Sequence, residues 1–270
     1  MIVIPAFYLH KVFSLFRTLK IKREKMKKVL KNMILGSTML LTSIGEDVYA
    51  QSNRNASSSL NAKQQNIVTI SAFTAKGDLV QLQKALSDGL DAGLTVNEIK
   101  EVLVHLYAYC GFPRSIRGLQ TLMSVLEERK AKGINDKSGA DASPVNDDGS
   151  KYERGKNILG KLTGAPQDAP QTGYSAFAPV IDTFLKEHLF ADIFERNVLS
   201  HQERELVTIS VLSTIGGVEP MLRSHLNICL NVGLTPEQLQ QFVSIIKTSA
   251  SEKEAQDAQA VLNEVIKSRQ

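Results

Sequence analysis

Two pairs of side chains with chemical potential are spaced four residues apart in the sequence. Glu101 and His105 form one pair, and His225 and Cys229 form the other. Residues at positions i and i+4 share one face of a helix, so each pair can act together if its segment is helical. A carboxylate beside an imidazole can orient the ring and raise its pKa, which suits a general acid or base. An imidazole beside a thiol can generate a nucleophile.

Each pair also has a structural alternative. Glu101 and His105 could be a partly exposed ion pair on a helix surface, or His105 could be a hydrogen-bonded core histidine. Cys229 could face the core as a small hydrophobic residue while His225 alone borders a pocket.

The residues that follow His105 predict one wall of a substrate site. Tyr109, Cys110, Pro113 and Arg114 lie within six positions. Arg114 comes just after a proline turn and could hold a substrate carboxylate through two parallel hydrogen bonds. Cys110 is expected at the C-terminal end of a helix, where the helix dipole disfavours a thiolate. The alternative for Arg114 is an ion pair with an acidic neighbour across an interface.

Helices must position these residues, and the sequence predicts the same helices twice. The segment from Asn66 aligns with the segment from Glu205: "VTIS" occurs at 68–71 and 207–210, and "GLT" at 93–95 and 233–235. In each copy the apolar spacing predicts helix, glycine turn, helix, "GLT" turn and helix. Thr95 and Thr235 suit the N-cap of the third helix. No segment alternates with period two, so we expect an all-α fold of two tandem helical repeats.

The two copies keep different polar residues at corresponding positions. The aligned pairs are Asn66 with Glu205, Ala85 with His225, His105 with Ile245, and Cys110 with Ala250. This division predicts a composite site to which each repeat contributes one wall. We expect the third helix of the first repeat to lie against the second helix of the second repeat. His105 and His225 would then face one cavity, with Glu205 within hydrogen-bond reach of His225.

The first 50 residues predict a signal peptide. A basic run follows Met26, an apolar stretch extends from Met33 to Ile44, and small residues precede a cleavage site after Ala50. Residues 1–25 are interpreted as an N-terminal extension, with Met26 as the true start. We expect an exported protein, periplasmic or extracellular, with no membrane segment after cleavage; the alternative is an uncleaved anchor.

Two further features of the sequence are its charge balance and a polar stretch between the two repeats. The chain carries a net charge of +4, and its first 50 residues hold nine basic and three acidic side chains, which leaves −2 for residues 51–270. That balance excludes a basic nucleic-acid-binding surface. The polar stretch 132–150 predicts a linker between a first repeat at 56–131 and a second at 151–270. No metal-ligand cluster or glycine-rich phosphate loop is visible.

These segments resemble the carboxymuconolactone decarboxylase family, which is related to the alkyl hydroperoxidase D proteins. The resemblance rests on Arg154-Gly155 and on three stretches, "EIKEVLVHLYAYCGFPRS" from Glu98, "LFADIFERNVLSHQERELVTISVL" from Leu189 and "LRSHLNICLNVGLTPEQL" from Leu222. It implies an all-helical homo-oligomer that acts on a small molecule without a metal or an organic cofactor.

The resemblance also implies roles for individual residues. Peroxidase members use C-x-x-C with a His four positions after the second Cys, and an upstream Glu as proton relay. His225 and Glu205 match the histidine and the glutamate, but Val218 and Met221 occupy the two cysteine positions. Because the second thiol must resolve the first, the missing pair disfavours the usual dithiol mechanism.

The preferred interpretation is a cofactor-free acid–base enzyme for a small carboxylate or lactone-like substrate. Its candidate catalytic residues are His225, Glu205, His105 and Glu101, and its candidate substrate-binding residues are Arg114, Tyr109 and Pro113. One alternative is a peroxidase-like protein that uses Cys110 and Cys229 in an unorthodox arrangement; another is a binding module without catalysis. The two cysteines could also pair as a disulfide in an oxidising compartment.

Overall fold

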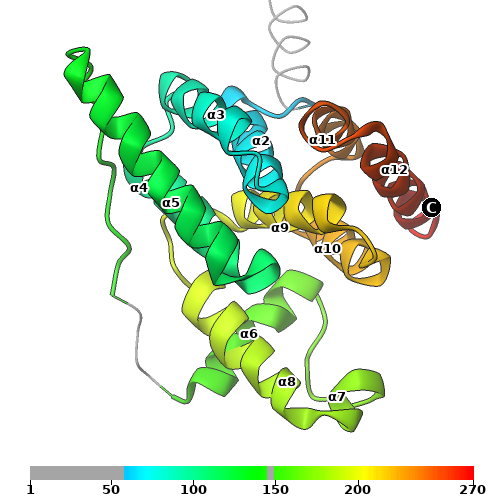
Figure 1. Cartoon of the computed structure of the whole chain (residues 1–270). Helices are drawn as coiled ribbons and strands as arrows, with labels where there is room; N and C mark the ends of the chain where they lie inside the picture. Colours follow the sequence, from blue (N-terminus) through cyan, green and yellow to red (C-terminus); the bar gives the residue numbers. More distant parts are fainter. Residues whose placement is uncertain (1–57, 145–148) are drawn as a thin grey trace, which may run out of the picture. The chain divides into compact units, whose positions relative to one another are not determined.

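The computed structural model describes residues 58–144 and 149–270, and all regular elements within them are helices (Figure 1). This confirms the expected all-α class. The predicted signal peptide from Met26 to Ala50 and the first two positions of the predicted first repeat lie outside the described residues. Among the helices that are described, none is long and apolar enough to cross a membrane.

The first repeat consists of α2 (Ala62–Lys76), α3 (Leu79–Asp91), α4 (Val96–His105) and α5 (Tyr107–Ala131). The Thr95 side chain accepts a hydrogen bond from the Glu98 backbone N–H while the Glu98 side chain bonds back to Thr95. This capping box satisfies two backbone donors at the start of α4. It confirms the expected N-cap.

The second repeat repeats this order with α9 (His201–Ile215), α10 (Glu219–Asn231), α11 (Pro236–Ser249) and α12 (Glu252–Lys267). Thr235 forms the matching capping box at α11, and Pro236 occupies its first turn. The expected helix order is therefore present in both copies, and each copy adds a fourth helix after the three predicted ones.

α5 is broken at Gly111, directly after Cys110, which was expected at the C-terminal end of a helix. Gly111 has φ 77° and ψ 162°, a conformation that favours glycine. Pro113 then lies in the first turn of the long part of α5, where its missing N–H costs no hydrogen bond. The break separates the turn that carries Tyr109 and Cys110 from the rest of the helix.

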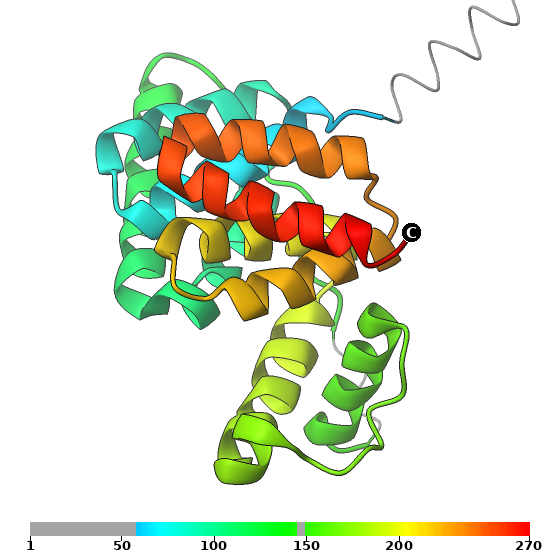
Figure 2. The same ribbon diagram turned by 90° about the vertical axis from the view of Figure 1, so that its right-hand side faces the viewer.

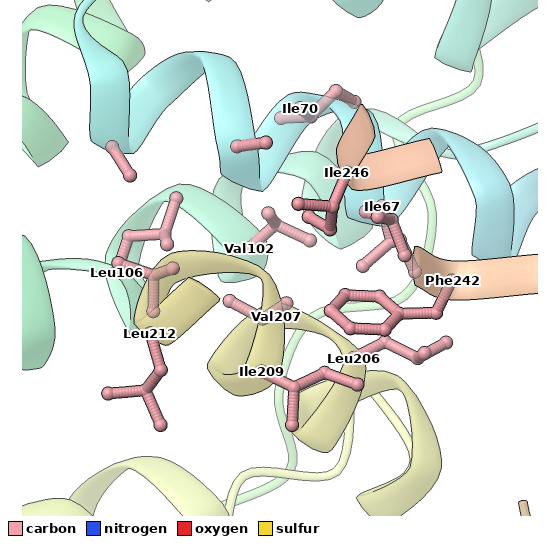
Figure 3. Close-up of a cluster of buried hydrophobic side chains, with 14 of the residues drawn as sticks. Ile67, Ile70, Val102, Leu106, Leu206, Val207, Ile209, Leu212, Phe242 and Ile246 are labelled. Carbon is pink, nitrogen blue, oxygen red and sulfur yellow. The ribbon is translucent and has the colours of Figure 1, made fainter. Parts of the chain in front are cut away.

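Equivalent helices of the two repeats pack on each other. α2 contacts α9, α4 contacts α9, and α11 contacts α2, a reciprocal pattern that fits a pseudo-twofold relation. Figure 3 shows the core between them, where Ile67 and Ile70 from α2 approach Val207 from α9 and Phe242 from α11. All four side chains are fully buried. At roughly 1.5–3 kcal/mol for each large apolar side chain, this shared core couples the two repeats strongly.

The extra prefix of the second repeat forms α6 (Lys151–Thr163), α7 (Gly173–Phe177), α8 (Pro179–Phe184) and the π-helix η1 (Leu185–Phe194). α6 packs against η1 as a hairpin that extends from the other helices (Figure 2). A Cβ on Gly155 would lie only 1.7 Å from the Lys186 carbonyl oxygen, so the close crossing requires glycine there. The hairpin carries a second apolar cluster that includes Phe190 and Phe194.

The stretch after α5, predicted as a linker, holds hydrogen bonds to the first repeat. The backbone N–H groups of Val96 and Asn97 donate to the carbonyls of Lys137 and Ser138. These bonds satisfy donors at the start of α4 that the helix itself leaves free.

Candidate acid–base site

The central contact of the site joins Glu205 on α9 to His225 on α10. The His225 Nδ1 lies 2.8 Å from Glu205 Oε2, as expected from the sequence. Glu205 is fully buried, while the His225 side chain keeps 12% exposure. A carboxylate only accepts, so the Nδ1–H donates and the second ring nitrogen is left for other partners.

The position of Glu205 follows from local sequence. Ser200 and Glu203 form a capping box that starts α9, and Glu205 lies about one turn further on. Residues 204–213 are all buried, because α9 lies between the other helices. The Glu205 Oε1 atom has no hydrogen-bond partner within residues 58–144 and 149–270. Burying a carboxylate oxygen without a hydrogen-bond partner costs free energy, so the position of Glu205 calls for a functional explanation.

His105 lies on the other side of the same region but is enclosed. Its ring stacks on Tyr109 at a centroid distance of 5.6 Å and meets the edge of Phe194 at 5.1 Å. Nε2 lies 3.0 Å from Thr208 Oγ1, and Nδ1 lies 3.4 Å from an Arg204 nitrogen. Burial, reinforced by the charges of Arg204 and His225, lowers the pKa of His105 well below its usual value.

Tyr109 connects the two histidines. Its ring is stacked on His105 and stands nearly perpendicular to His225, with a centroid distance of 6.2 Å. The Thr208 hydroxyl donates to the Tyr109 hydroxyl at 3.2 Å. Tyr109 and His105 come from the first repeat, and His225 and Thr208 come from the second. Both repeats therefore contribute residues here, as expected, but two parts of the composite prediction are wrong: α4 packs on α9 rather than on α10, and neither His105 nor His225 lines a described cavity.

The pseudo-twofold relation defines a second, equivalent position between the repeats. There, other residues replace the polar residues of the site. Asn66 and Ala85 stand where Glu205 and His225 would be, and Ile245 and Ser249 stand where His105 and Tyr109 would be. The chain thus keeps one polar site of the two that its duplication could have formed.

Comparison with known proteins decides the family. Residues 46–122 and 179–264 match the sequence pattern of the Carboxymuconolactone decarboxylase family, which is more than half of the chain. The chain belongs to this family. It is also 27% identical over 97 residues to the 4-carboxymuconolactone decarboxylase of Acinetobacter baylyi, an overlap of 36% of this chain and 72% of that protein.

Glu101 does not pair with His105 in this family member, which corrects the expected carboxylate–imidazole pair. Glu101 is buried and binds Arg196, with an Nε–Oε1 distance of 3.0 Å, and Arg204, with an Nη2–Oε2 distance of 3.1 Å. Burial alone would raise the pKa of Glu101, but the hydrogen bonds from Arg196 and Arg204 outweigh it and hold the pKa below its usual value. The ion pairs join α4 to the second repeat.

Arg204 does not form a salt bridge with Glu205, its neighbour in the sequence. It is instead fully buried and bonded to Glu101 and to the Arg196 carbonyl oxygen. Successive helix residues point in different directions, so Arg204 and Glu205 serve two separate contacts.

The structure does not support the two cysteines as a nucleophile pair. Both are free thiols. Burial raises the pKa of Cys110 to about 11. Burial, followed by the charge of Glu205, raises the pKa of Cys229 well above its usual value. Cys229 is fully buried in the core, as its structural alternative predicts. Since the thiolate is the reactive form, both sites disfavour thiol chemistry at neutral pH.

Arg114 and Pro113 lie on the exposed surface of α5. The Arg114 guanidinium rests against the backbone of Gly77, where an added Cβ would lie 1.5 Å from one of its nitrogens. This contact with α2 gives Arg114 a packing role. Its expected role as an anchor for a substrate carboxylate stays a prediction.

Three contributors to the site were not predicted from sequence: Thr208, Arg196 and Phe194. Thr208 belongs to the repeated "VTIS" motif, so its signal was visible but indicated only the repeat. Two described cavities lie elsewhere, one of about 380 Å³ between α3 and α5 and a smaller one between α9, α10 and α12. No group of three or more His, Cys, Asp or Glu side chains that could hold a metal occurs within the described part of the chain.

Proposed function

We propose that this protein is a cofactor-free acid–base catalyst that acts on a small carboxylated or lactone-like substrate. In this proposal His225 is the proton donor and acceptor, and Glu205 holds it in place. The supporting observation is the 2.8 Å contact between a fully buried carboxylate and an imidazole that keeps 12% exposure. Buried carboxylates in this position fix the tautomer and orientation of a catalytic imidazole.

The chemistry required of such a site is simple. When a carboxylated lactone loses CO₂, the carbon–carbon bond breaks and its electron pair delocalises onto the conjugated carbonyl oxygen. A protonated imidazole then gives its proton to carbon, and the electron pair forms the new C–H bond. Glu205 stabilises the imidazolium and orients it before the transfer. The same residues could also catalyse a proton shift within the substrate in which no CO₂ is lost.

The substrate class is proposed from the family and from one relative. The Acinetobacter baylyi protein is named for the decarboxylation of 4-carboxymuconolactone. We propose a related carboxylated lactone for this chain. We further propose that the protein acts as an exported homo-oligomer, on the basis of the expected signal peptide and the family resemblance.

The test is a substrate panel with two readouts. The mature chain is incubated with carboxylated γ-lactones while release of CO₂ is followed, and separately with hydrogen peroxide and a dithiol. We expect CO₂ release that survives Cys110→Ala and Cys229→Ala. Peroxide turnover that is abolished by Cys229→Ala in a folded protein would favour the redox alternative. Tight binding without turnover would favour a binding module.

A further inference from the structure

His105 is too enclosed to exchange protons with a substrate. Arg204 is only a donor, so His105 Nδ1 must accept from it. The Nε2 atom therefore carries the proton and donates to Thr208 at 3.0 Å. Both nitrogens are engaged, and the ring has no exposed surface. A group in this state can orient its neighbours but has no path to a reacting atom.

The neighbour that His105 orients is Thr208, whose single proton has two acceptors within reach. One is the Arg204 carbonyl oxygen at 3.0 Å, and the other is the Tyr109 hydroxyl oxygen at 3.2 Å. The hydrogen bond from His105 occupies one lone pair of Thr208, so the Thr208 O–H is directed to these two acceptors and away from His105. When Thr208 donates to Tyr109, the phenolic proton of Tyr109 is left available for another acceptor.

Tyr109 is in position to use that proton. Its ring stands nearly perpendicular to that of His225 at a centroid distance of 6.2 Å, and its hydroxyl accepts from Thr208 of the second repeat. Burial and then the charge of Glu205 raise the pKa of Tyr109 above its usual value, so the phenol stays protonated. It is thus suited to donate a hydrogen bond and unsuited to act as a base.

We infer that Tyr109 is the second functional group of the site. It donates a hydrogen bond to the substrate oxygen that gains negative charge, while His225 moves the proton at carbon. Thr208 and His105 are positioning residues that hold the phenol in its donating orientation. This inference rests on the proposed function. It replaces the expected pair of acid–base histidines with one histidine and one tyrosine.

The probe for this inference is tetronic acid, a five-membered lactone whose enol is ionised at neutral pH. It carries the charge on oxygen that the proposed intermediate would carry. Its affinity for the full chain is measured by calorimetry. We expect Tyr109→Phe to weaken binding by about tenfold to a hundredfold, the loss typical of one hydrogen bond to a charged acceptor. Tyr107→Phe is the control, because Tyr107 stacks on Phe112 instead.

The positioning role is tested at Thr208. Thr208→Val should weaken binding at least severalfold, and Thr208→Ser should restore it because the hydroxyl returns. Thr69→Val is the repeat-matched control, since Thr69 makes the same bond to a carbonyl one turn earlier, at 3.0 Å. Normal affinity in Thr208→Val would overturn the positioning role.

Failure of the inference and failure of the proposed function give different results. If His225→Ala loses the probe while Tyr109→Phe binds it as wild type does, the tyrosine inference is wrong and the acid–base proposal stands. If the wild-type chain does not bind the probe, or His225→Ala binds it unchanged, both are contradicted. Circular dichroism of each variant confirms that it is folded.

Discussion

Replacing Glu101 by Gln should destabilise the protein by about 3 kcal/mol, because it leaves Arg204 buried without a negative partner. Breaking one side of a buried ion pair typically costs roughly 3–5 kcal/mol. The lower value applies here because Arg204 keeps its bonds to the Arg196 carbonyl, at 2.6 and 3.2 Å. The Arg196 side chain is 37% exposed, so its ion pair with Glu101 contributes little to the stability.

The assay is urea unfolding at neutral pH, with Asp88→Asn as the control. Asp88 forms an exposed i,i+4 pair with Lys84, which should contribute less than about 0.5 kcal/mol. For a unit of this size, a loss of about 3 kcal/mol lowers the melting temperature by roughly 6–12 °C. Equal stability of the Glu101→Gln and Asp88→Asn variants would refute the reasoning.

The pH dependence gives an independent check. The folded pKa of Glu101 lies below its unfolded value. The stabilisation is therefore fully present above the unfolded pKa and is lost as the pH falls through the folded pKa. The difference between wild type and Glu101→Gln should shrink in acid, whereas a constant difference from neutral pH to about pH 3 would contradict the assignment.

Cys110→Ala and Cys229→Ala should each cost on the order of 1 kcal/mol of stability through a small cavity, with little kinetic effect; a large loss of activity in either folded variant would contradict the acid–base site. Nitrogen-15 NMR should show His105 as the neutral tautomer protonated on Nε2, still neutral at the pH where a free imidazole is half protonated, and a charged ring there would contradict its enclosure. Mass spectrometry of protein from the native host should find Gln51 at the new terminus, whereas retention of the apolar leader would contradict export.

Much of the helical framework was predictable because its signals are local. Capping residues such as Thr95 and Thr235, and the left-handed glycines after the second helices, act within one turn. The duplication then allowed each copy to confirm the other. The aligned losses at Asn66 and Ala85 even predicted that the site would draw on both repeats.

The partners of charged residues were not predictable in the same way. The i, i+4 rule placed Glu101 and His105 on one face correctly, but Arg196 and Arg204 compete for the carboxylate from 95 and 103 positions away. A buried ionised carboxylate is bound most strongly by a full positive charge, so arginine outcompetes a neutral imidazole. The π-helix that brings Phe194 against His105 also has no simple sequence signature.

The most direct test of the central claim is solvent isotope incorporation. A carboxylated lactone that the wild-type chain turns over is incubated in D₂O, and the product is examined by NMR at the carbon that loses CO₂. We expect one solvent deuteron there, and a rate reduced roughly 10²-fold or more in His225→Ala and clearly reduced in Glu205→Gln. Incorporation at the wild-type rate in His225→Ala would contradict the claim that His225 moves the proton.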